Sequence, residues 1–133
     1  FGADSLTAAE LSKCVWRTVS DERPGAWGRW HGHVFDQQGS KNDGWASKAS
    51  LYEYADEVEG VSASTLRTCM REQGEAVADL VDRDVAVAVE DLGLRRATPV
   101  FAISKPSSGK WLDVPGAQPY GVFEKALKQV DEA

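Results

Sequence analysis

The sequence predicts an α+β protein in which a run of helices precedes one β-hairpin and a closing helix. Three observations support this order. Apolar residues recur three and four positions apart through most of residues 7–92, which is the spacing of a helix face. Two short runs rich in β-branched and aromatic residues, 98–103 and 110–114, follow this helical part. After Pro119 the helical spacing returns.

The first predicted helix covers residues 7–19, because Ser5 and Thr7 are capping residue types and an acid follows in the first turn. Its apolar face contains Leu6, Ala9, Cys14 and Val15. Residues 20–25 (SDERPG) end this helix, since proline cannot continue the backbone hydrogen bonds. A second helix ends near Gln38, and we expect its bulky apolar stripe in the core. That stripe comprises Trp27, Trp30, Val34 and Phe35.

A third amphipathic helix follows the polar loop of residues 39–44. Its apolar face comprises Leu51, Tyr54, Ala55 and Val58. Ser62 opens a fourth helix, which we expect to break at Gly74 because glycine weakens helices. A long helix then covers residues 75–92 and ends at Gly93.

The two β-type runs are joined by a short polar segment containing Pro106 and Gly109, which predicts an antiparallel hairpin. The last helix starts at Pro119, since proline is tolerated in a first turn. Its apolar face comprises Val122, Phe123, Ala126, Leu127 and Val130. A two-stranded hairpin is marginal by itself in water. We therefore expect its exposed edge to pair with further strands that this sequence does not supply.

Composition indicates one globular domain, because 133 residues with 42% hydrophobic content can bury a core. The net charge is −6, and the acids are spread along the chain. This argues against nucleic-acid and anionic-membrane partners, which need a basic face. The longest apolar stretches are far shorter than the roughly 20 residues of a membrane span. The first residues, FGAD, contain no signal-peptide pattern, so we expect a chain that starts after processing or truncation.

Cys14 and Cys69 lie too far apart in sequence to form a local redox or metal motif by themselves. One long-range disulfide and two buried free thiols are both open interpretations. His31 and His33 point in directions roughly 200° apart on a helix, which disfavours a shared metal. We expect His31 to be partly buried, His33 to face solvent, and the tryptophans to anchor the core rather than form a ligand cage. No metal or other cofactor is expected.

In residues 93–103 (GLRRATPVFAI) the predicted long helix ends and a Thr-Pro pair opens a strand. This segment resembles the corresponding one of DsbA-like, thioredoxin-fold thiol-disulfide oxidoreductases, and two further segments resemble the same family. Residues 114–123 (VPGAQPYGVF) resemble the junction between the last strand and the final helix. Residues 25–38 (GAWGRWHGHVFDQQ) align without gaps with a helical segment that carries a Phe-Trp pair, a His and then Leu-Phe.

Within residues 25–38, His31 and Phe35 fall in register with the family pattern. Trp27 replaces the usual Phe, and Gly28 stands where the family has Trp. The helices around residues 51–58 and 62–70 also resemble the family's helical insert, so the resemblance covers nearly the whole chain.

The resemblance implies an α/β, thioredoxin-like fold with a DsbA-type helical insert, of which this chain is the C-terminal part. Within a single domain, 1–133, residues 1–92 would form the insert and long helix, and residues 93–133 the hairpin and last helix. The family's Cys-x-x-Cys motif, with the strands on either side of it, is expected before Phe1. Since no cysteine here has a partner two residues away, we expect no catalytic residue and no activity in this chain alone.

The resemblance also implies a substrate groove at Ala97, Thr98 and Pro99, with a cis Thr98–Pro99 bond. Such a bond leaves backbone groups of the preceding residue free to pair with a substrate peptide. Cys14 and Cys69 would form a structural disulfide, which persists in an extracytoplasmic compartment: periplasmic, secreted or cell-envelope. The implied partners are an extended protein or peptide substrate and a second chain that supplies the missing strands.

Two other functions stay open. A redox-inactive thioredoxin-like module would use the groove near Thr98 and Pro99 to bind an extended peptide or partner protein without electron transfer. A helical interaction protein would pair its hairpin with another chain. A Cys-x-x-Cys motif upstream of Phe1 favours the oxidoreductase, and its absence favours the binding module.

Overall fold

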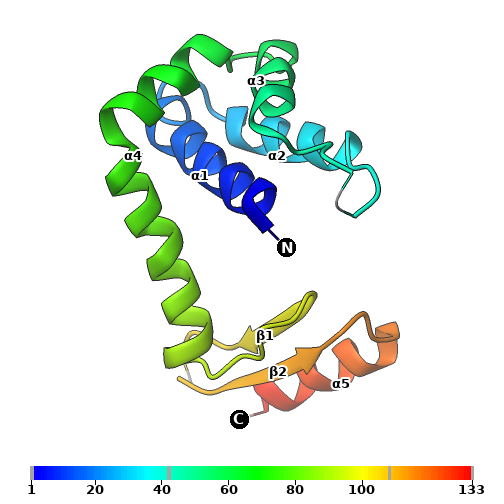
Figure 1. The fold of residues 1–133 in the computed structure, drawn as a ribbon. Helices are drawn as coiled ribbons and strands as arrows, with labels where there is room; N and C mark the ends of the chain where they lie inside the picture. The colour runs from blue at the N-terminus through cyan, green and yellow to red at the C-terminus, as the bar shows by residue number, and fades with distance from the viewer. Residues whose placement is uncertain (1, 42, 108, 133) are drawn as a thin grey trace. The chain divides into compact units, whose positions relative to one another are not determined.

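The structure, a computed structural model, describes residues 2–41, 43–107 and 109–132. The chain divides into two compact units, Phe1–Asp82 and Arg83–Ala133, and each is described by itself (Figure 1). The architecture is α+β, as predicted. In chain order the elements are α1 (Gly2–Thr18), α2 (Ala26–Asp36), α3 (Lys48–Glu57), α4 (Ala63–Ala86), the π-helical turn η1 (Val87–Asp91), β1 (Val100–Ser104), β2 (Trp111–Pro115) and α5 (Tyr120–Asp131).

Helix α1 begins at Gly2, five residues before the predicted start. The Thr7 hydroxyl donates to the backbone carbonyl of Ala3 at 3.1 Å, so Thr7 lies inside the helix and is not its cap. The expectation that Leu6 lies on the buried face was also wrong, since Leu6 is about half exposed. Leu6 precedes the fully buried Leu11 by five residues, which places it about 140° away around the helix.

Helices α2 and α3 form where the sequence predicts them. Gly25 precedes α2 with a left-handed φ of 84°, a conformation that glycine adopts without steric conflict. Ser47 caps α3, because its hydroxyl accepts the Ser50 N–H at 3.2 Å. The Trp30 indole Nε1–H of α2 donates to the Ser12 hydroxyl of α1 at 3.0 Å, which satisfies the polar atom of a fully buried ring.

Helix α4 runs without interruption through Gly74, so the predicted break there was wrong. A glycine inside a helix costs about 1 kcal/mol relative to alanine, and the good helix formers on both sides outweigh this loss. The helix then widens into η1 and ends before Gly93, whose φ is +61°. None of the described helices is both long and apolar enough to cross a bilayer.

The core of the first unit lies between α1, α2, α3 and α4. Its largest fully buried side chains are Trp30, Leu11, Leu51 and Leu66. Trp27 and Trp45 are partly buried against this core. Trp16 is 61% exposed and Phe35 is 58% exposed, so the expectation that these two rings anchor the core was wrong.

The second unit contains the predicted antiparallel hairpin. In its register Phe101 lies opposite Val114, and Ile103 opposite Leu112. These four side chains share one face because alternate strand residues point to the same side. Phe101 packs edge-on against Phe123 of α5, with ring centroids 4.9 Å apart, so this apolar face is the one that α5 covers.

Candidate functional site

Residues 97–99 come directly before β1. The family resemblance predicts a substrate groove at these three residues. Ala97, Thr98 and Pro99 are all exposed, and the Thr98–Pro99 bond is cis, as expected. The Ala97 N–H donates to the Arg95 carbonyl at 2.8 Å, and the Pro99 carbonyl accepts the Gly116 N–H at 2.8 Å. The structure therefore brings these three residues together at an open strand start. Whether they bind a substrate stays a prediction.

The outer edge of β1 is open, because the described residues form a sheet of only two strands, in the order β1–β2. At the end of β1, the Lys105 ammonium lies 3.1 Å from the Asp131 carboxylate and donates to the Asp131 carbonyl at 2.8 Å. These contacts identify the side of α5 that faces β1. On a helix with 3.6 residues per turn, Tyr120 and Leu127 lie within about 40° of Asp131.

Tyr120 and Leu127 belong to the same side of α5 and are 79% and 57% exposed. Phe101 of β1 is also partly exposed, at 41%. Two exposed apolar side chains of α5 therefore lie on the same flank as Asp131, which contacts Lys105 at the end of β1. Another strand could pair with the free backbone groups of β1 and pack on the exposed apolar side chains of α5.

The hydrophobic core of the second unit is small. Among its described residues the buried hydrophobic side chains are Val114, Ala126 and Val130. No residue of η1 is buried, and Val85 and Val87 are each 43% exposed. The second unit therefore buries few apolar side chains among its described residues.

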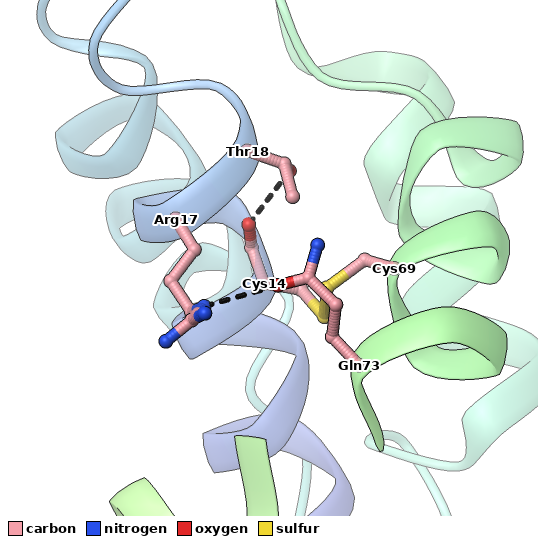
Figure 2. The surroundings of a disulfide bond; sticks show 5 residues. All are labelled: Cys14, Arg17, Thr18, Cys69 and Gln73. Carbon is pink, nitrogen blue, oxygen red and sulfur yellow. Dashed lines mark hydrogen bonds between the residues drawn. A yellow bond between two sulfur atoms is a disulfide. The ribbon is translucent and has the colours of Figure 1, made fainter. Parts of the chain in front are cut away.

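Cys14 of α1 and Cys69 of α4 form a disulfide in the first unit, in agreement with the expectation from the family resemblance (Figure 2). Both cysteines are buried. One turn further along, the Arg17 guanidinium donates from Nε to Oε1 of Gln73 at 3.2 Å, so α1 and α4 are joined by a second contact on the same face. The chain has two cysteines, and this bond uses both of them.

The two histidines have the opposite environments to those expected. His31 is exposed and stacks on Trp27, with ring centroids 4.9 Å apart. His33 is the partly buried one, and its Nε2 lies 2.9 Å from a carboxylate oxygen of Glu57 on α3. The reason is their position around α2: His33 lies next to the buried face of this helix, which is directed towards α3, and His31 lies further from that face. The described residues contain no group of three or more His, Cys, Asp or Glu side chains placed to hold a metal ion.

No protein-family model, no curated protein and no solved structure matches this chain.

Proposed function

We propose that this chain is the C-terminal part of a DsbA-like thiol-disulfide oxidoreductase that acts on protein dithiols and disulfides. The observation that carries the proposal is the open edge of β1, which begins directly after the exposed residues Ala97, Thr98 and Pro99 and lies beside the uncovered apolar side chains of α5. A thioredoxin-like fold needs one further strand at this edge, together with the helix that carries Cys-x-x-Cys.

The small core of the second unit supports this proposal. Hairpins become stable when a third strand or a packed helix buries one face, and α5 covers only part of this one. A strand beside β1 would gain backbone hydrogen bonds and would also cover Leu127 and Tyr120. That strand would come from another segment of the natural protein or from a second chain.

In this proposal the residues of the chain have binding roles and no covalent role. The nucleophile is a thiolate of the upstream Cys-x-x-Cys motif, whose pKa a helix N-terminus lowers. The backbone of Ala97 and Thr98 aligns an extended substrate so that its sulfur faces that thiolate. The Cys14–Cys69 disulfide supports an extracytoplasmic location, because such bonds persist in oxidising compartments.

The test is reduction of insulin disulfides by dithiothreitol, measured with this chain and with the protein extended to its natural N-terminus. We expect no rate above background from this chain and clear catalysis from the extended protein. Ala97→Arg in the extended protein should slow catalysis roughly tenfold, because the larger side chain obstructs the backbone of Ala97 and Thr98 and costs one or two backbone hydrogen bonds to the substrate. Ala49→Arg is the matched control, since Ala49 is also exposed but lies on α3 in the first unit. An extended protein that contains Cys-x-x-Cys but does not catalyse the reaction would refute the proposal.

A redox-inactive binding module is the second candidate function. It is favoured by the fact that both cysteines of the chain are buried in one disulfide. Titration with extended peptides, followed by amide NMR, should then shift the signals of Ala97 and Val100 whether or not a Cys-x-x-Cys segment is present. Binding without catalysis in an extended protein that lacks this motif would favour the module over the enzyme.

A further inference from the structure

Two adjacent arginines, Arg95 and Arg96, come directly before the exposed residues Ala97, Thr98 and Pro99. Both arginines are exposed. In the part of the chain that the structure describes, neither guanidinium has a hydrogen bond, an ion pair or an aromatic ring as its partner. A cation stabilises a helix within its last turn, but these two residues follow the end of η1 by several positions. Their charges are therefore available to a ligand.

A tight turn fixes the backbone of this arginine pair. The Ala97 N–H donates to the Arg95 carbonyl at 2.8 Å, which makes a three-residue turn with Arg96 at its centre. The Pro99 carbonyl accepts the Gly116 N–H at 2.8 Å, so this segment is also tied to the residue after β2. Arg96 is thus held one residue before Ala97, whose backbone would align the substrate. A neighbouring strand lies about 4.8 Å away, a distance that a long arginine side chain can span.

The charge around this segment is positive, although the protein as a whole is acidic. Residues 92–104 contain both arginines and no Asp or Glu. Asp113, the acid of the two strands, lies opposite Ala102 on β2 and therefore away from the open edge of β1. The net charge of −6 belongs to residues 1–82, because residues 83–133 contain equal numbers of acidic and basic side chains. An acidic ligand thus finds complementary charge beside the open edge of β1.

We propose that the substrate of this chain is an extended polypeptide with an acidic side chain within two residues of its cysteine, and that Arg95 and Arg96 bind this acid. The inference rests on the proposed function, since it assumes that the backbone of Ala97 and Thr98 aligns the substrate. Arginine suits this role because its planar guanidinium can donate two parallel hydrogen bonds to one carboxylate. The two arginines bind the substrate and take no part in the covalent exchange, so they should affect KM and leave kcat unchanged.

The first experiment measures peptide binding to the protein extended to its natural N-terminus, without a redox step. Two fluorescein-labelled peptides that carry Ser in place of Cys are compared by fluorescence anisotropy. One has Glu on both sides of this Ser, and the other has Gln. We expect the Glu peptide to bind about threefold to tenfold more tightly at low salt, as for two exposed ion pairs. In about 1 M sodium chloride the two affinities should become equal, because the screening length falls to about 3 Å.

The double variant Arg95→Gln, Arg96→Gln should bind both peptides with the affinity that the wild type has for the Gln peptide. The double variant Lys48→Gln, Arg71→Gln is the matched control, because it removes the same charge from exposed residues of α3 and α4. This control should keep the preference for Glu. The proposal would be overturned if the wild type bound the two peptides equally at low salt or bound neither. It would also be overturned if the preference survived in the Arg95 and Arg96 variant.

Catalysis separates this inference from the proposed function. Each peptide, with its Cys restored and linked as a symmetric disulfide dimer, is reduced by dithiothreitol in the presence of the extended protein. We expect a threefold to tenfold higher kcat/KM for the Glu peptide, through KM, and equal kcat values. Equal kcat/KM values would overturn the acidic preference and leave the oxidoreductase intact. Binding that prefers Glu, without catalysis of either peptide, would instead refute the oxidoreductase and support the arginine site in a binding module.

Discussion

Removal of the Cys14–Cys69 disulfide should destabilise the first unit strongly. The bond joins residues 55 positions apart, α1 to α4. In the chain-entropy model, a loop of this length contributes about 4 kcal/mol by restricting the unfolded chain. A typical domain has only about 5–15 kcal/mol of stability in total, so this loss is large. For a unit of this size it corresponds to a fall in Tm of roughly 15–30 °C.

The assay is urea unfolding followed by far-UV circular dichroism, which reports mainly the helices of the first unit. The free energy of unfolding is compared between the oxidised protein, the protein reduced with a phosphine, and the double variant Cys14→Ala and Cys69→Ala. The reductant should have no effect on the double variant, which makes it the control for other actions of the reagent. The reasoning would be refuted if reduction and the double substitution each lowered the free energy of unfolding by less than about 1 kcal/mol, because the chain-entropy model would then not describe this loop.

Three further changes have defined expected outcomes. Gly74→Ala should raise the free energy of unfolding by about 1 kcal/mol, because α4 is continuous there; a loss of stability would mean that the helix breaks at this position. Ser47→Ala should lower stability by about 1 kcal/mol through loss of the α3 cap, and Ser47→Asp, which can still accept the hydrogen bond, should restore most of it in the same urea assay. Lys105→Met should change stability by less than about 1 kcal/mol, since its ion pair with Asp131 is exposed; a larger loss in thermal unfolding would contradict that estimate.

The sequence predicted most of the elements because their signals are local. Pro24 and Gly25 separate α1 from α2, and Gly93 ends the long helical part. Gly74 was misread as a break, since propensity at one residue decides little when a helix gains packing on both sides. Thr7 was misread as a cap because threonine is a common capping residue. In the structure its hydroxyl bonds within the helix, and α1 continues back to Gly2.

Less of the candidate site could be predicted from the sequence. The pairing of Cys14 with Cys69 followed from the family resemblance, because spacing alone left free thiols equally open. The exposure of Phe35 was missed, because the sequence places it in the same apolar stripe as the buried Trp30 and Val34.

The central claim, that the open edge of β1 receives one more strand, is tested most directly by hydrogen exchange of the β1 amides. The measurement compares this chain with the protein extended to its natural N-terminus. We expect the outward-facing amides among Val100–Ser104 to exchange rapidly in this chain and at least roughly a hundredfold more slowly in the extended protein, because a paired strand exchanges only on opening. Equal exchange of these amides in the two proteins, with Leu127 and Tyr120 still accessible to solvent, would contradict the account.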